Sequence, residues 1–215
     1  SVAGVGVSGT GAILNTSGNN TIAGLVTLTG NTTIGSLAGT LTFDVSTGNA
    51  FTGTYDLTFD GAGSFAVADP IATGTGGVTK NGAGTLLGAA GVISDTAAVT
   101  IYGTFDLYGY SEEVGSIAGT GLITSSRSGT PTLTVGGNNS STTFSGVLEN
   151  GLSVVALTKT GTGTMTLGTA NTYTGVTTIT GGAISIAADA GLGVAPGSAS
   201  SGALVLNGGS VIASN

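Results

Sequence analysis

The stretch that decides the fold reads LTKTGTGTMTL and occupies residues 157–167. Its apolar residues alternate with threonine on both sides of a central Gly-Thr-Gly, a pattern that predicts two short strands joined by a tight corner. A second copy, TKNGAGTL, occupies residues 79–86, so equivalent positions lie 79 residues apart. A weaker copy, TFDGAGSF, occupies residues 58–65, which is 21 positions before the second. Repetition at these spacings favours a solenoid over a sandwich or a barrel.

A further pair of segments supports a solenoid. GSLAGT at residues 35–40 returns as GSIAGT at residues 115–120, 80 positions later. A period near 20 within one near 80 suggests coils grouped in fours. We therefore predict an all-β, right-handed parallel β-helix of roughly ten coils, with a rod about 50 Å long at about 4.8 Å per coil. The same spacing predicts that Lys80 and Lys159 lie on one side of the rod, about four coils or about 19 Å apart.

The composition agrees with a β-rich chain. Of 215 residues, 42 are glycine and 40% are hydrophobic, while only 6% are charged. Threonine, serine, glycine and valine are poor helix formers, and the good ones are scarce, which excludes a helical bundle. Disorder is excluded because it requires low hydrophobicity and high net charge. We interpret residues 1–215 as a single β-solenoid segment.

The residue types that are missing exclude several functions. The chain has no histidine and no cysteine, so it lacks the commonest general base, the commonest metal ligands and any thiol chemistry. Its net charge of −7 argues against nucleic acid and anionic membranes as partners. No apolar run is long enough for a membrane span, so we expect no membrane insertion by this segment.

The carboxylates do not form an obvious site. A polysaccharide-acting β-helix enzyme would need clustered acids with a cationic partner. Asp56 and Asp60 face outward from one predicted strand and are interpreted as solvated surface, and Glu112-Glu113 is interpreted as a turn. The aspartate in residues 59–64 does not recur at the coil spacing that stacked Ca²⁺ ions would require. We predict no catalytic, cofactor-binding or metal-binding residue.

Two other groups of residues could bind or pack. Lys80 and Lys159 occupy equivalent repeat positions, and we interpret them as edge residues that discourage lateral strand pairing. Tyr102, Tyr108 and Tyr110 form an aromatic cluster in sequence that could stack on sugar rings. We favour a structural role for this cluster.

Threonine pairs raise a second class of function, because flat arrays of such pairs on a solenoid can bind ice. The pairs are Thr27/Thr29, Thr40/Thr42, Thr132/Thr134, Thr164/Thr166 and Thr172/Thr174. Their separations are not one constant coil length, so we expect that they do not align into one array. A glycan- or ice-binding solenoid stays an alternative, and a polysaccharide-acting enzyme is a second one.

The region around the first stretch resembles a known family. After LTKTGTGTMTL come ANTYTG at residues 170–175 and TTITGG at residues 177–182. This order resembles the passenger-associated transport repeat of bacterial autotransporters. The likeness is best over residues 115–215, and a weaker, earlier repeat covers residues 20–90. The earlier copy lacks the Asn-Thr-Tyr segment after Leu86.

The resemblance implies a function without chemistry. It implies a non-catalytic structural stalk or adhesive segment of an exported surface protein, or of an extracellular fibre. The location would then be extracellular, at the surface of a Gram-negative bacterium. A surface glycan or a receptor of unknown identity would be the binding partner.

Both ends of the chain already alternate like interior coils. Residues 1–7 and 204–213 show apolar alternation and no polar cap of the kind that ends natural solenoids. We therefore expect more solenoid at both ends, from the same polypeptide or from a second copy joined head to tail.

Overall fold

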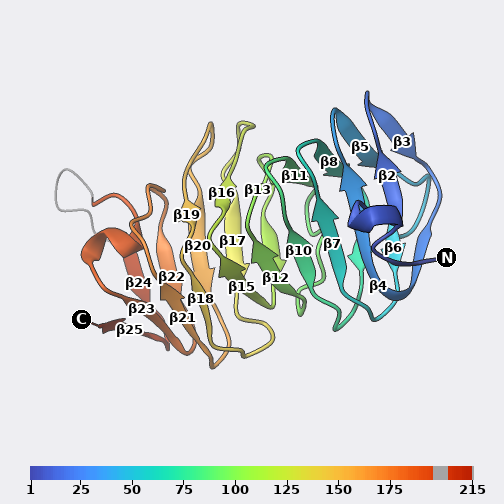
Figure 1. Cartoon of the computed structure of the whole chain (residues 1–215). Helices are drawn as coiled ribbons and strands as arrows, with labels where there is room; N and C mark the ends of the chain where they lie inside the picture. Colours follow the sequence, from blue (N-terminus) through green and yellow to red (C-terminus); the bar gives the residue numbers. More distant parts are fainter. Residues whose placement is uncertain (196–202, 215) are drawn as a thin grey trace.

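The computed structural model describes residues 1–195 and 203–214 and has the form of a rod. The chain winds as an all-β parallel solenoid of about eight turns, and its colours follow one another along the rod from the N-terminal to the C-terminal end (Figure 1). Every strand pair among the described residues is parallel. Residues 196–202 and 215, which the sequence assigns to the solenoid, lie outside the described residues.

The strands stack on three faces, although some turns lack a strand on one of them. Face 1 contains β1 (Val2–Gly4), β2 (Ile13–Asn15), β4 (Val26–Ser36), β7 (Leu57–Asp60), β10 (Val78–Lys80), β12 (Ala98–Ile101), β15 (Ser116–Gly119), β18 (Thr142–Phe144), β21 (Thr164–Leu167), β23 (Ala183–Ile186) and β25 (Ser210–Ala213). Face 2 contains β3 (Asn20–Ile22), β5 (Thr40–Phe43), β8 (Ser64–Val67), β11 (Thr85–Gly88), β13 (Thr104–Asp106), β16 (Leu122–Thr124) and β19 (Val147–Leu148). Face 3 contains β14 (Glu112–Val114), β17 (Thr132–Val135), β20 (Ala156–Lys159), β22 (Thr177–Ile179) and β24 (Leu204–Leu206). β6 (Phe51–Thr52) and β9 (Ile71–Ala72) stack on the first part of β4 and precede the face 1 strands of their turns, as the strands of face 3 do, so we count them with face 3.

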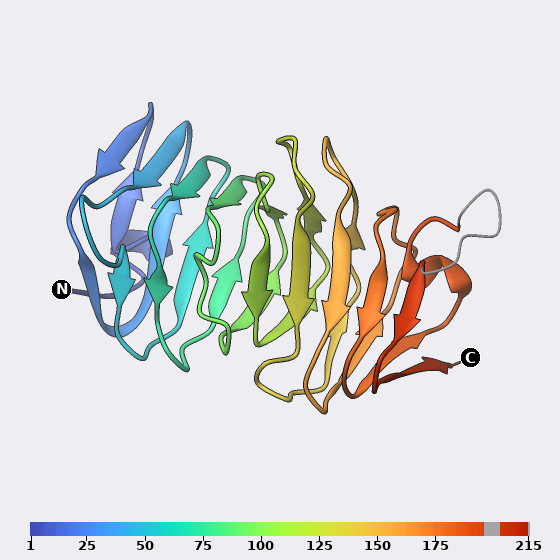
Figure 2. The same ribbon diagram turned by 180° about the vertical axis from the view of Figure 1, so that it is seen from behind.

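The short helical segments lie near the two ends of the rod. They are the 3-10 helices η1 (Val7–Gly9) and η2 (Asp189–Leu192). Figure 2 shows the rod from behind, with the same succession of strands. Among the described residues, no helix has the length and apolar character that crossing a membrane requires.

The alternation read from the sequence matches the burial of side chains. On face 1, Leu57, Val78, Val99 and Ile117 are register partners on successive turns, and all are buried. Alternate residues point outward because successive side chains of a strand point to opposite sides. Each turn therefore buries its inner residues only against its neighbours, and the stack forms one continuous core.

Aromatic residues fill the core towards the N-terminal end. The rings of Phe43 and Phe51 lie 4.6 Å apart between centroids, and those of Phe59 and Phe65 lie 5.0 Å apart. Phe59 also contacts Phe51 edge to face at 5.8 Å. Such tilted and edge-to-face pairs are the arrangements that aromatic rings prefer, and they join the three faces of two successive turns.

The structure has about eight turns, which differs slightly from the predicted count of roughly ten coils. Ile34, Phe59, Lys80, Ile101 and Gly119 follow one another in register on face 1, at intervals of 25, 21, 21 and 18 residues. These intervals average about 21 residues, which is the predicted coil length, but they are not uniform. About eight turns at about 4.8 Å each give a rod of about 38 Å.

The grouping of coils in fours is also wrong. Four turns separate Ile34 from Gly119, which is 85 residues and not 80. Leu37 and Ile117 are equivalent in the 80-residue repeat, yet Leu37 is exposed and Ile117 is buried. The longer sequence repeat therefore does not correspond to a whole number of structural turns.

Glycine is required at the repeated corners. Gly82 and Gly161 have φ of 65° and 62°, in the left-handed region that side chains rarely adopt. A Cβ on Gly82 would lie 2.4 Å from the oxygen of Gly61, and one on Gly161 would lie 2.1 Å from the oxygen of Gly136. The corner thus needs glycine both for its conformation and because the backbone of the preceding turn is close.

Candidate functional site

The repeated corners hold two buried lysines. Lys80 is the last residue of β10, and its side chain is fully buried inside the solenoid. Its Nζ donates hydrogen bonds to the carbonyl oxygens of Asn81 and Gly82, the latter at 3.3 Å. The ammonium also lies 5.8 Å from the centre of the Phe65 ring. Lys80 therefore binds the corner that follows it from the inside.

Lys159 does the same at another corner. It ends β20 and is 1% exposed. Its Nζ donates to the carbonyl oxygens of Thr160 and Gly161, and to that of Gly181 on the next turn at 3.4 Å. A single ammonium group with three donors can thus bind carbonyls of two stacked corners.

Both expectations for these lysines are wrong. They are not edge residues, because their side chains point into the core, where the corner carbonyls would otherwise lack donors. They do not share a side of the rod either, because β10 belongs to face 1 and β20 belongs to face 3. The repeated stretch defines a corner, and the chain uses that corner at two different edges of the solenoid.

Burial changes the acidity of these groups. Desolvation lowers the pKa of Lys80 from 10.5 to about 8, although the nearby Asp60 carboxylate raises it. Burial also lowers the pKa of Lys159. The position of Lys80 is otherwise apolar, because its register partners on the adjacent turns are Phe59 and Ile101.

Glu112 is a third buried charged residue. The interpretation of Glu112-Glu113 as a turn is wrong, because both residues belong to β14 and Glu112 points inward at 3% exposure. Its carboxylate accepts hydrogen bonds from the backbone N–H groups of Val92, at 3.0 Å, and Ile93, at 2.6 Å. The side chain satisfies donors of the preceding turn, which compensates its burial. Desolvation raises the pKa of Glu112 to about 7, although the two N–H groups lower it.

The other carboxylates bind backbone at the surface. Asp56 is exposed and accepts a hydrogen bond from the Gly77 N–H at 2.8 Å, and Asp60 is half-buried and accepts one from the Gly61 N–H at 2.7 Å. Within residues 1–195 and 203–214, no group of three or more acidic residues lies close enough together to hold a metal ion. These aspartates shape turns and do not converge.

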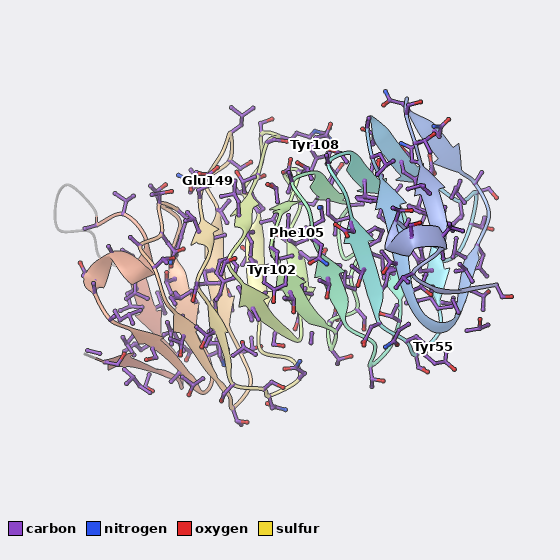
Figure 3. The ribbon with its side chains drawn as sticks, in the orientation of Figure 1. Tyr55, Tyr102, Phe105, Tyr108 and Glu149 are labelled. Carbon is purple, nitrogen blue, oxygen red and sulfur yellow. The ribbon has the colours of Figure 1, made fainter. Side chains whose placement is uncertain are left out.

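The three tyrosines do not form one cluster. Tyr102 precedes β13, whereas Tyr108 and Tyr110 follow it, and Figure 3 shows Tyr102 and Tyr108 at separate places on the rod. Tyr108 and Tyr110 instead share a partner, Arg127. The guanidinium carbon of Arg127 lies 5.4 Å from the Tyr108 ring centre and 5.7 Å from that of Tyr110.

The threonine pairs lie on different faces, as expected from their unequal spacing. Thr40/Thr42 belong to β5 on face 2, Thr132/Thr134 to β17 on face 3, and Thr164/Thr166 to β21 on face 1. The sequence reasoning missed a column of single threonines on the outside of face 1. Its members are register partners on four successive turns: Thr33, Thr58, Thr79 and Thr100.

This column lines a shallow groove of about 440 Å³ together with Asn31 and Asp56. It ends at Ala118, which pairs with Thr100 on the next turn. Stacked threonines stabilise adjacent strands, and the column is one residue wide, unlike the paired array considered for ice binding. Its signal in the sequence is the separation of 25, 21 and 21 residues, which becomes recognisable only when the register is known.

Buried polar side chains hold the segment that follows β21, after the corner that Lys159 binds. Asn171 is 3% exposed, accepts a hydrogen bond from the Leu148 N–H at 2.8 Å and donates to the Gly191 carbonyl at 2.7 Å. The buried Tyr173 hydroxyl pairs with the Thr177 hydroxyl at 2.7 Å. Burial raises the pKa of Tyr173 to about 12. Asn171 thus connects three successive turns.

Lys159, Asn171 and Tyr173 fall within the part of the chain that matches a protein family. Residues 157–186 match the Passenger-associated-transport-repeat family. No curated protein and no solved structure matches the chain. The match agrees with the resemblance seen in the sequence.

The transport repeat spans one turn of the solenoid and the first two strands of the next turn. It runs from β20 to the end of β23, and Leu157 and Thr177 on face 3 are register partners one turn apart. Its lysine, asparagine and tyrosine bind backbone or hydroxyl groups inside the rod. The transport repeat is thus a stacking unit, and transport repeats belong to autotransporter passengers, which implies an exported surface protein.

Proposed function

We propose that the chain is a non-catalytic structural stalk from the passenger of an exported protein at the surface of a Gram-negative bacterium. The observation that carries the proposal is the unbroken stacking of parallel turns from β4 to β25 on face 1, with a transport repeat among them. A rod of this kind holds whatever lies beyond it at a fixed distance. Function on such a scaffold resides in separate sites.

Matched deletions of one turn test the role of the transport repeat. Deleting residues 157–176 removes one turn within the repeat, because Leu157 and Thr177 are register partners. Deleting residues 59–79 removes an ordinary turn, because Phe59 and Lys80 are register partners. Both shortened chains should fold as rods, because each joins equivalent positions.

The shortened chains are then fused to an autotransporter membrane domain, and their surface display is compared by antibody labelling of intact cells. We expect display to fall several-fold when the turn of the transport repeat is deleted, and to stay near the level of the full chain when the ordinary turn is deleted. Equal display of the two shortened chains would contradict the role of the repeat.

We also propose that the stalk has no enzymatic activity. The side chains of Asp56 and Asp60 accept backbone hydrogen bonds, and the groove that Asp56 lines does not include Asp60. The purified chain should release no reducing or unsaturated ends from pectin, alginate, cellulose or peptidoglycan, with or without Ca²⁺. Turnover that is lost in Asp56→Ala or Asp60→Ala would support the alternative of a polysaccharide-acting enzyme.

We further propose that another coil of solenoid, from the same polypeptide, stacks on the last described turn. Leu204 and Leu206 are register partners of the buried Thr177 and Ile179, yet they are 41% and 55% exposed. A further coil would bury these inner side chains. Light scattering tests the proposal: the 215-residue chain should associate with rising concentration, and a chain extended by a natural capping coil should stay monomeric. Stable head-to-tail dimers of the extended chain would instead favour a second copy as the partner.

A further inference from the structure

The corner after β13 carries a backbone conformation that its side chain does not favour. Tyr108 has φ of 50° and Gly109 has φ of 81°, and the Tyr110 N–H donates to the Leu107 carbonyl at 2.9 Å. Positive φ at both central positions is the signature of a type I′ turn, in which asparagine followed by glycine is preferred. A bulky side chain at positive φ is an outlier, and such outliers concentrate at functional sites.

Neighbouring groups force the turn into this shape. Asp106 accepts hydrogen bonds from the N–H groups of Tyr108, at 2.8 Å, and Ser126, at 2.9 Å. The Ser125 hydroxyl accepts one from the Gly109 N–H at 2.8 Å. Two adjacent turns of the solenoid thus hold the Tyr108 ring outward, and Figure 3 shows it at the edge of the rod.

The Tyr108 ring stands beside an apolar groove. The groove has a volume of about 310 Å³, and its floor is made by Ala66, Ala68, Leu87 and Ala89 of the two preceding turns on face 2. Ala66 and Leu87 are register partners whose side chains point outward. Tyr108 and Tyr110 line the same groove and are 37% and 39% exposed. A flat apolar floor beside aromatic rings fits the apolar face of a sugar ring.

Arg127, on the following turn, places a positive charge against the two tyrosine rings that line this groove. Of the three lysine and arginine side chains, all of which the structure describes, Lys80 and Lys159 are buried and Arg127 alone is exposed. Its Nη1 donates to the Tyr110 hydroxyl at 3.0 Å, which holds the planar guanidinium against both rings. A guanidinium has five N–H donors in a fork that matches carboxylate geometry. The one exposed cationic side chain of a chain with net charge −7 therefore lies against the rings that line the aromatic groove.

We propose that this groove, which we call the Tyr108 groove, binds a sugar ring that carries an anionic group, as in an acidic extracellular polysaccharide. The ring stacks on Tyr108 over the alanine floor, and the anionic group pairs with Arg127. This binding goes beyond the stalk role, so its failure would leave the stalk proposal intact.

The test uses the 215-residue chain and polysaccharides of three kinds in affinity gel electrophoresis. Polygalacturonate carries carboxylates, heparin carries sulfates as well, and dextran is neutral. We expect retardation by an acidic polysaccharide and none by dextran. Retardation by polygalacturonate identifies the carboxylate as sufficient, and retardation by heparin alone identifies the sulfate. No retardation in any gel, or equal retardation by dextran, would overturn the proposal.

Four variants separate recognition from folding. Tyr108→Asn creates the preferred Asn-Gly turn, so its Tm should be equal to or higher than that of the unmodified chain, while affinity falls about ten-fold. Arg127→Gln should lower the affinity by a similar factor, and Arg127→Lys should lower it less, because lysine keeps the positive charge. Tyr55→Ala removes an exposed tyrosine outside the groove and should leave affinity unchanged. A lower Tm for Tyr108→Asn with unchanged binding would instead indicate a purely structural role for Tyr108.

Discussion

Replacing Lys80 by methionine should change how the stability of the rod depends on pH. The pKa of Lys80 is about 8 in the folded chain, against an ordinary value of 10.5. The fold therefore disfavours the charged side chain, and this cost is fully present below about pH 8. As the pH rises from about 8 to 10.5, the folded state loses its proton before the unfolded state does, so the free energy of unfolding increases.

The size of this effect follows from the two pKa values. The interval from about 8 to 10.5, at about 1.36 kcal/mol for each pH unit, corresponds to about 3.4 kcal/mol. In Lys80→Met this gain is absent, because no proton is lost at that position. The difference in unfolding free energy between the two chains should therefore shift by about 3 kcal/mol in favour of the lysine chain between pH 7 and pH 11.

Urea denaturation followed by circular dichroism at half-unit intervals from pH 7 to pH 11 measures this shift. The packing cost of methionine and the lost hydrogen bonds to Asn81 and Gly82 change the unfolding free energy by the same amount at every pH. They therefore do not affect how the unfolding free energy depends on pH. Titration of Tyr173 and Lys159 affects both chains alike. Thr79→Val, on the outward side of the same strand, serves as the control and should run parallel to the unmodified chain. Parallel curves for Lys80→Met would show that the ammonium is not desolvated, and would refute the reasoning.

Three further substitutions test the core, the corners and the buried acid. The raised pKa of Glu112 favours the protonated folded state, so the free energy of unfolding of the unmodified chain should fall by up to about 3.4 kcal/mol as the pH rises from about 4.5 to 7. Glu112→Gln should remove this fall, and denaturation from pH 4 to 8 measures it. Gly91 has a similar positive φ but open space where Gly82 meets the Gly61 oxygen, so Gly91→Ala should lower the free energy of unfolding by about 1–2 kcal/mol. Gly82→Ala should lower it clearly more, and equal costs in urea denaturation would refute crowding at Gly82. Phe59→Ala should cost about 3–5 kcal/mol in the same assay, since its ring packs between others in the core, and a cost below about 1 kcal/mol would contradict that packing.

The local pattern of the sequence determined the type of fold. Apolar residues at every second position predict strands, and the repeated glycine corners predict that these strands stack as coils. Both patterns can be recognised within about 20 residues of sequence, so they can be read without knowing the register. The transport repeat was recognisable for the same reason, because its residues are nearly contiguous within one turn and the two following strands.

Only the tertiary structure decided which residues meet. The intervals between register partners vary, for example 27 residues between Thr177 and Leu204 against 18 between Ile101 and Gly119, and a slip of one residue moves a side chain from the core to the surface. Charge alone predicts an exposed position for a lysine such as Lys80. It is buried because the solenoid brings unpaired carbonyls to the inside of a corner. The pairing of Tyr108 with Arg127 likewise depends on two adjacent turns, because stacking, and not sequence distance, sets which loops are neighbours.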